Sequence, residues 1–114
     1  MNKFIKIIFF NILIFPLLFL NLVTASEKLK VGLLVPMTGS NKDLGHSIIK
    51  AVRLAIKDID NDLFEIFPKD TASSPDKTLQ SALELKDIGV KIVIGPVFHK
   101  SLIYLDEVID LTFL

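Results

Sequence analysis

The sequence predicts an α/β fold of three layers, in which helices cover both faces of a parallel sheet with Rossmann-like βαβαβα order, preceded by an apolar signal helix. Short apolar runs alternate with longer segments in which apolar residues recur at helical spacing. Proline, glycine or polar turn formers end each run. The helical segments are about ten residues long or more, as right-handed crossovers between parallel strands require.

The N-terminal segment has the parts of a secretory signal peptide. Lys3 and Lys6 form a basic start, and no charged residue occurs from Ile7 to Ser26, where most residues are Ile, Leu, Phe or Val. Val23-Thr24-Ala25 then places small residues at the −3 and −1 positions of a cleavage site. We therefore expect a signal peptide over residues 1–25, a domain over residues 26–114, and export to the periplasm.

An uncleaved membrane anchor is the alternative for this segment, because about 20 apolar residues can span a bilayer. Pro16 and Asn21 interrupt the apolar run, and the Val-x-Ala ending is typical of cleavage. These features favour removal of the segment over retention.

Composition excludes several classes of function. The 114 residues include no cysteine, which excludes thiolate chemistry, disulfides and a lipid anchor on a cysteine after the cleavage site. Lysine plus arginine and aspartate plus glutamate each number 13, and loss of Lys3 and Lys6 leaves 11 positive against 13 negative charges, or −2. That balance lacks the basic footprint of a nucleic-acid-binding protein.

The first strand and first helix are the clearest elements. Leu29 to Val35 is a near-continuous apolar run closed by Pro36, as in a strand buried on both faces. From Asp43 to Asp60 apolar residues recur every three or four positions, and Asp43 can cap the start of this helix.

The remaining elements follow the same alternation. Leu63 to Phe67 is predicted as a strand that Pro68 stops, and Ser74-Pro75-Asp76 as a helix start with a capping hydroxyl. Gly89 ends that helix as a left-handed cap. The last predicted elements are a strand over Val90–Ile94, a helix over Ser101–Asp110 and the opening of a fourth strand over Leu111–Leu114.

Three loops follow the carboxyl ends of the predicted strands, where ligands of open α/β sheets bind. They are Pro36–Asn41, Lys69–Ser74 and Gly95–Ser101. Each precedes a predicted helix whose first N–H groups attract anions, so a small polar or carboxylated ligand would fit. Hydroxyls lie close to these helix starts at Thr38, Ser40, Ser73, Ser74 and Ser101. The alternative is that these hydroxyls only cap helices and form turns.

Motifs of enzymes are missing from the sequence. Gly39 and Gly45 do not form G-x-G-x-x-G, and neither a Walker loop nor a G-x-S-x-G elbow occurs. His46 and His99 lie far apart, with no cysteine to join them in a metal site. We expect a protein that is not an enzyme and uses no cofactor.

Three stretches resemble one family. VGLLVPMTG, the helix DLGHSIIKAVRLAIKDID and GVKIVIGPV are similar to type I periplasmic binding proteins of the leucine/isoleucine/valine-binding branch. LLVPMTGS and IGPVF also resemble the related domain of penicillin-binding protein activators. The resemblance spans Leu29 to Leu114 and implies the first, truncated part of lobe 1 in a two-lobed protein with a ligand cleft.

The resemblance also implies a function and a site. The leading expectation is the solute receptor of an ABC transporter, which captures an amino acid or small carboxylate and delivers it to a membrane permease. The alternative is an activator that contacts a penicillin-binding protein. The implied ligand-facing residues are Thr38, Gly39, Ser40, Pro96, Val97, Phe98 and His99, with Ser101. Phe98-His99-Lys100 stands where amino-acid binders carry a run of small hydroxyl residues. This departure argues against a free amino acid as the ligand and is one reason to keep the activator as the alternative.

Overall fold

The computed structural model describes residues 2–6, 26–59, 62–108 and 110–114. Most of the expected signal peptide, and the expected cleavage site after Ala25, lie outside the described residues. Within the described parts of the chain, no helix combines the length and the apolar character needed to cross a membrane.

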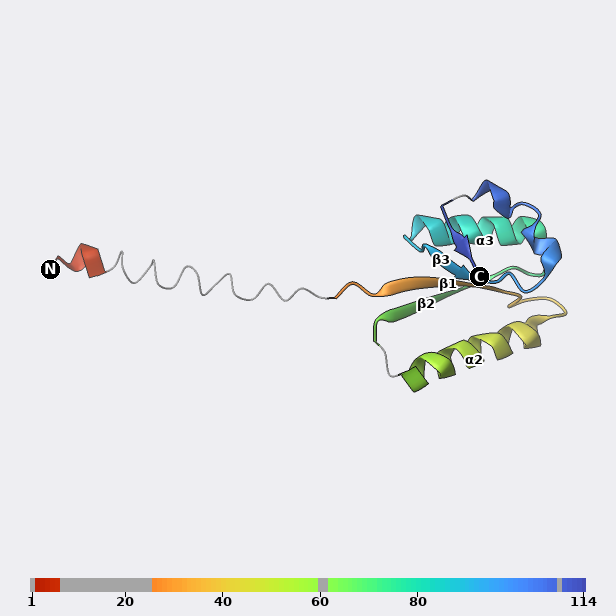
Figure 1. Ribbon diagram of the computed structural model, residues 1–114, viewed down its shortest axis with the longest axis horizontal. Coiled ribbons are helices and arrows are strands. Elements are labelled where there is room, and N and C mark those ends of the chain that lie inside the picture. The colour runs from red at the N-terminus through yellow and green to blue at the C-terminus, as the bar shows by residue number, and fades with distance from the viewer. Residues whose placement is uncertain (1, 7–25, 60–61, 109) are drawn as a thin grey trace.

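A parallel sheet forms the middle layer. In the described part of the chain its four strands lie in the order β2-β1-β3-β4 and are all parallel, as predicted. The strands are β1 (Leu29–Val35), β2 (Phe64–Asp70), β3 (Ile92–Ile94) and β4 (Thr112–Phe113). Helix α2 (Lys42–Ile59) covers one face, and α3 (Pro75–Asp87) covers the other together with two 3₁₀ turns, η1 (His99–Leu102) and η2 (Leu105–Glu107) (Figure 1). The predicted α/β class is therefore confirmed.

Strand β1 lies at the centre of the domain, which explains its continuous apolar sequence. It pairs with β2 on one side and β3 on the other, and every residue from Val31 to Val35 is buried. Because side chains alternate along a strand, Leu34 points to the α3 face and Leu33 and Val35 to the α2 face.

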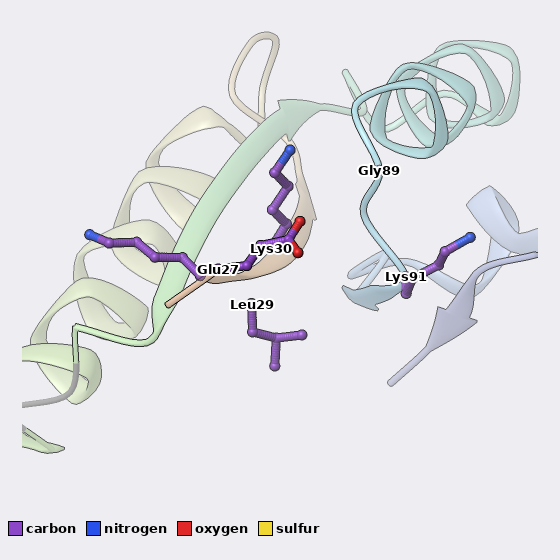
Figure 2. A pocket seen from close by; sticks show the side chains of 6 residues that line it. Glu27, Leu29, Lys30, Gly89 and Lys91 are labelled. Carbon is purple, nitrogen blue, oxygen red and sulfur yellow. The ribbon is translucent and has the colours of Figure 1, made fainter. Parts of the chain in front are cut away.

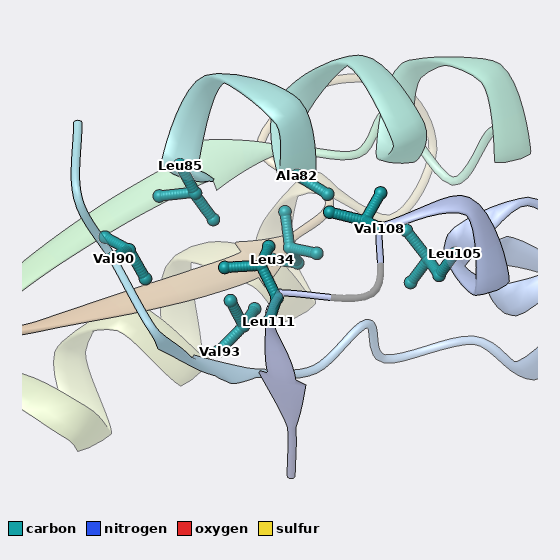
Figure 3. Packing of buried hydrophobic residues seen from close by; sticks show 8 residues of the cluster. All are labelled: Leu34, Ala82, Leu85, Val90, Val93, Leu105, Val108 and Leu111. Carbon is teal, nitrogen blue, oxygen red and sulfur yellow. The ribbon is translucent and has the colours of Figure 1, made fainter. Parts of the chain in front are cut away.

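The larger core lies between the sheet and α3. Figure 3 shows apolar side chains from β1, α3, β3 and η2 meeting there. Its buried members are Leu34, Ala82, Leu85, Val90, Val93, Leu105, Val108 and Leu111. A smaller core lies under α2, where Ile49 packs on Leu33 and Val35. The α3 side therefore holds most of the buried apolar surface.

Strand β2 does not stop at Pro68 as predicted but continues to Asp70. Among the described strands, β2 lies at the edge of the sheet and pairs with β1 alone. Just before β2 the Leu63 carbonyl accepts from β1, and just after it the Thr71 N–H donates to β1, so the odd-numbered positions of β2 face β1. The backbone of Pro68, at an even position, therefore points to the open edge, where the missing N–H leaves no strand–strand bond unmade.

The predicted helix over 101–110 is wrong. The structure has η1 and η2 instead, in which Ser101 N–H bonds to Phe98 O and Val108 N–H to Leu105 O, each three residues back. Leu105 and Val108 are buried, but Leu102, one turn before Leu105, is 46% exposed, so no continuous apolar face holds a longer helix against the sheet.

Helix ends follow the predictions in part. Asp43 lies inside the first turn of α2, which begins at Lys42, and does not precede it as a cap. Ser74 is the N-cap of α3 but makes no side-chain capping bond; its carbonyl accepts from Thr78 instead. Gly89 has φ of +86° and ends α3 in the left-handed conformation, as predicted.

Candidate functional site

The first candidate loop leaves the sheet at Pro36 and reaches α2 through Gly39, whose φ of +81° suits a glycine turn. Its position depends on Gly45 in the first turns of α2. A Cβ on Gly45 would lie 1.8 Å from the Pro36 carbonyl oxygen, so the helix approaches the loop backbone more closely than any other residue allows. Thr38, Gly39 and Ser40 are all exposed at this loop.

Asp70, at the end of β2, binds this loop with both carboxylate oxygens. Oδ1 accepts the N–H groups of Met37 at 2.7 Å, Thr38 at 3.2 Å and Ala72 at 2.8 Å. Oδ2 accepts the Thr38 hydroxyl at 2.6 Å. The carboxylate therefore joins the loops that follow β1 and β2.

The hydrogen bonds at Asp70 also set its charge state. Partial burial acts to raise the pKa of this carboxyl, but the bonds from the Thr38 hydroxyl and from the N–H groups of Ala72, Met37 and Thr38 outweigh it. The pKa of Asp70 consequently lies below its ordinary value of 3.8, and the group is an anion at neutral pH.

The loop after β2 is itself tightly held. Ala72 and Ser73 have φ of 47° and 56°, in the left-handed region that non-glycine residues rarely adopt. The Asn41 side chain donates to Ser73 Oγ at 3.1 Å, which gives a second bond between the two loops. The Ser81 hydroxyl donates to the Asp70 carbonyl at 2.6 Å, which fastens the loop to α3.

The third candidate loop begins at Gly95, at the carboxyl end of β3. Gly95 has φ of +100°, and a Cβ there would lie 2.5 Å from the Leu34 carbonyl oxygen. After it, Pro96 and Phe98 are half-buried, whereas Val97, His99 and Lys100 are exposed. Ser101 is 1% exposed, and its hydroxyl has no hydrogen-bond partner in the described part of the chain.

All the predicted site residues thus lie at one edge of the sheet, because β1 and β3 are adjacent and parallel. The hydroxyl of Thr38 faces Asp70, and that of Ser101 is buried. Asp70 lies in the second predicted loop but was not among the predicted site residues, because its contact with the first loop follows from the pairing of β2 with β1. Within the described residues, no group of three or more side chains has the makings of a metal site.

A pocket of about 300 Å³ opens at the other edge of the sheet, near the amino ends of β1 and β3 (Figure 2). It is lined by Glu27, Lys28, Leu29, Lys30, Gly89 and Lys91. Lys30 Nζ donates to the Ile88 carbonyl at 2.9 Å, so this cation caps the C-terminus of α3. The pocket lies away from the carboxyl-edge loops.

An apolar groove of about 390 Å³ lies between α2 and the sheet. It is lined by Leu29, Val31, Val52, Ala55, Ile56, Ile59, Phe64, Ile66, Ile92, Ile94 and Leu114. With no polar residue in its lining, the groove offers packing surface and no group for binding a polar ligand.

The sheet order, the crossovers and the loops at the carboxyl edge define an open, parallel α/β domain. A profile described as periplasmic binding protein matches residues 28–108. The chain therefore belongs to the type I periplasmic binding protein family, as the resemblance predicted.

Solved structures of periplasmic binding proteins and of one further protein have a similar fold. A solute-binding protein of an ABC transporter from Rhodopseudomonas palustris BisB5, in complex with 3,4-dihydroxybenzoic acid, is 31% identical over 71% of this chain and 24% of its own, with a TM-score of 0.66. The leucine-binding protein LivK from Thermotoga maritima is 22% identical over 64% of this chain and 22% of its own, with a TM-score of 0.59. Full-length LpoA from Haemophilus influenzae is 21% identical over 77% of this chain and 16% of its own, with a TM-score of 0.58.

The two neighbours below 25% identity share the fold, and the R. palustris protein shares sequence as well. The chain spans about a quarter of the length of the R. palustris protein. Among curated proteins, no sequence matches the chain.

Proposed function

We propose that the chain is the first part of the solute receptor of an ABC transporter, which captures a small carboxylate in the periplasm and passes it to a membrane permease. The observation that carries this proposal is the 31% identity to a solute-binding protein in complex with 3,4-dihydroxybenzoic acid. An amino acid or an aromatic acid is the ligand class. Export would depend on the signal peptide over residues 1–25.

The carboxyl-edge loops supply the groups that such a ligand needs. His99 and Lys100 are exposed at the end of the third loop, and the Lys100 ammonium can attract a carboxylate. Val97 and Phe98 precede them and offer apolar contact to the body of the ligand. Gly39 and Ser40 lie exposed at the first loop, on the neighbouring strand.

Ser101 supports the proposal in another way. A buried hydroxyl without a partner costs about 1–3 kcal/mol. The Ser101 hydroxyl is in this state within the described part of the chain, and it follows the exposed His99–Lys100 pair. A ligand group or a water held at this loop would give it a partner.

Ligand capture in the whole protein is proposed to occur by hinge closure of a second lobe over these loops. The length of the R. palustris protein, of which this chain spans 24%, is consistent with a second lobe. Lobe 1 would then supply the cationic and hydroxyl groups of the cleft.

Thermal unfolding of the full chain, scanned against leucine, benzoate and 3,4-dihydroxybenzoate, tests the proposal. A ligand that binds only the folded state raises the unfolding midpoint. We expect one of these carboxylates to raise it, and Lys100→Ala to remove the rise. Lys50→Ala, at an exposed position of α2, is the matched control and should keep it. A cooperative transition that no carboxylate moves would contradict the proposal.

The second candidate is an activator that contacts a penicillin-binding protein. The stretches LLVPMTGS and IGPVF and the shared fold with LpoA support it. Binding of the full chain to a purified penicillin-binding protein, together with no response to carboxylates, would favour this function over the solute receptor.

A further inference from the structure

The first loop of an open α/β sheet commonly holds an anion, because its N–H groups point outward beyond the strand ends. In this protein the N–H groups of Met37 and Thr38 point at Asp70 Oδ1, at 2.7 and 3.2 Å. The N–H of Ala72, from the neighbouring loop, reaches the same oxygen at 2.8 Å. Three backbone donors thus converge on one carboxylate oxygen, in the way that a backbone nest holds a bound anion.

The Thr38 hydroxyl is engaged by the same group. It donates its proton to Asp70 Oδ2 at 2.6 Å. A hydroxyl has one proton and two lone pairs, so this one can still accept a hydrogen bond but has none left to donate. A ligand carboxylate would find no donor on the Thr38 side chain and would be repelled by the negative charge behind it.

Bonds within the chain fix the position of Asp70. Its carbonyl accepts the Ser81 hydroxyl at 2.6 Å, and the Ala72 N–H, at the start of the left-handed turn Ala72–Ser73, donates to its Oδ1 at 2.8 Å. The bond from Asn41 to Ser73 at 3.1 Å holds the two loops together on the far side. The carboxylate is therefore preorganised against the first loop.

We propose that Asp70 is an internal anion that fills the N–H cradle of the first loop, and is thereby a positioning and specificity-determining residue. It gives the loop its conformation and leaves Thr38 to accept a hydrogen bond from a ligand. Resting on the proposed function, this orients the ligand: its carboxylate lies toward His99 and Lys100, and a hydroxyl or ammonium group lies toward Thr38.

Chemical rescue by acetate tests the internal anion directly. In Asp70→Ala the cradle loses its carboxylate, so amide hydrogen exchange at Met37, Thr38 and Ala72 should become about tenfold faster or more. Added acetate should bind in the empty N–H cradle of the variant. The three amide resonances should then shift saturably with acetate concentration, and their hydrogen exchange should slow again. The wild-type protein should show no such shifts, and chloride at equal ionic strength should not replace acetate.

Glu84→Ala is the matched control, because Glu84 is another hydrogen-bonded carboxylate, held by Lys69 Nζ at 2.8 Å and away from the three amides. It should leave the exchange of the three amides unchanged. Equal acetate shifts in wild type and Asp70→Ala, or a folded Asp70→Ala whose amides exchange as in wild type, would overturn the proposal.

Asp70→Asn decides the matter if Asp70→Ala does not fold. The carboxamide oxygen can keep all three N–H bonds at the Oδ1 position while its NH₂ group faces Thr38 Oγ1. Exchange at Met37 and Ala72 should then stay close to wild type, and the Thr38 hydroxyl becomes free to donate. If Asp70→Asn folds but these amides exchange about tenfold faster or more, the proposed geometry is contradicted.

Ligand orientation has its own readout. Benzoate has a carboxylate and no donor, whereas 3,4-dihydroxybenzoate adds two hydroxyls. In wild type benzoate should shift amides at His99 and Lys100 but not at Thr38, and the dihydroxy acid should shift both loops. Benzoate shifts at Thr38 equal to those at Lys100 would overturn the orientation. Absence of any binding would refute the proposed function and with it the orientation, while the acetate result would still decide the internal anion.

Discussion

The contact between Gly45 and Pro36 determines where the first loop leaves the sheet. The side chain of any other residue would overlap the Pro36 carbonyl oxygen, since the Cβ would lie 1.8 Å from it. That atom belongs to the backbone of a buried residue and cannot rotate away as a flexible side chain can.

Gly45→Ala should therefore lower the free energy of unfolding by about 2 kcal/mol or more, at the upper side of overpacking costs. Urea unfolding of the full chain measures the change. Lys50→Ala, in the same helix but exposed, should stay within about 0.5 kcal/mol of wild type. A Gly45→Ala protein as stable as this control would show that close packing of α2 on the first loop is not required for stability.

Asp70 also makes stability depend on pH. The pKa of Asp70 is lower in the folded state than its ordinary value of 3.8. The ionised carboxylate therefore contributes to the free energy of unfolding above pH 3.8, and this contribution is lost as the pH falls through the folded-state pKa. Asp70→Asn should cost about 1 kcal/mol at neutral pH. The difference from wild type should shrink in acid, as measured by urea unfolding at several pH values. A difference that stays constant down to acid pH would contradict the lowered pKa.

Glu84 and Asp110 do not obscure that comparison. Hydrogen bonds and charge attraction from Lys69 and Lys86, respectively, lower the pKa of each carboxyl. Both groups are present in wild type and in Asp70→Asn, so their effects cancel in the difference.

Sequence reasoning at the residue scale found the candidate loops but not the bonds within them. Thr38 was predicted as a ligand-facing hydroxyl from its place after the first strand, and its loop does lie at the carboxyl edge. The partner of that hydroxyl, Asp70, is 32 positions away, and only the parallel pairing of β1 with β2 brings the two together. A contact set by sheet register is not visible in a local motif.

At the scale of elements, a local sequence pattern predicted the structure correctly where the residue type favours a single conformation. Gly89 was predicted as the helix end because its left-handed conformation suits glycine. Pro68 misled because the same residue stops a central strand and is tolerated on an edge strand, and strand order decides which. The last predicted helix was wrong because a spacing of three, as between Leu102, Leu105 and Val108, fits both an α-helix and 3₁₀ turns.

Gly89→Ala tests the end of α3 and should cost about 1–2 kcal/mol. A Cβ there would meet only Lys30 Nζ, at 4.0 Å, so the cost comes from the φ of +86° and not from crowding. Urea unfolding should show a lower midpoint with the slope unchanged. Gly89→Asn, which tolerates the left-handed conformation better, should recover part of the loss; an Asn variant no more stable than the Ala variant would count against this cause.

At the scale of the whole molecule, the two faces of the sheet are unequally covered. The α3 face holds the larger core, and Leu85 is fully buried in it. The α2 face holds a smaller core beside the apolar groove. Stability should therefore depend mainly on the α3 side.

Leu85→Ala should cost about 2–5 kcal/mol, the usual range for a buried leucine. Leu54→Ala, at a position of α2 that is 60% exposed, makes the same chemical change outside the core and should cost under about 0.5 kcal/mol. Thermal or urea unfolding of both variants gives the comparison. Equal losses would mean that the α3 core is not the principal source of stability.

The most direct test of the account is an NMR titration of the full chain with 3,4-dihydroxybenzoate, followed residue by residue. We expect saturable amide shifts at the two carboxyl-edge loops, around Thr38–Ser40 and Val97–Lys100, and no shifts at the pocket around Lys30 and Lys91. Shifts confined to that pocket or to the apolar groove beside α2, or no saturable shifts, would contradict a ligand site at the carboxyl edge of the sheet.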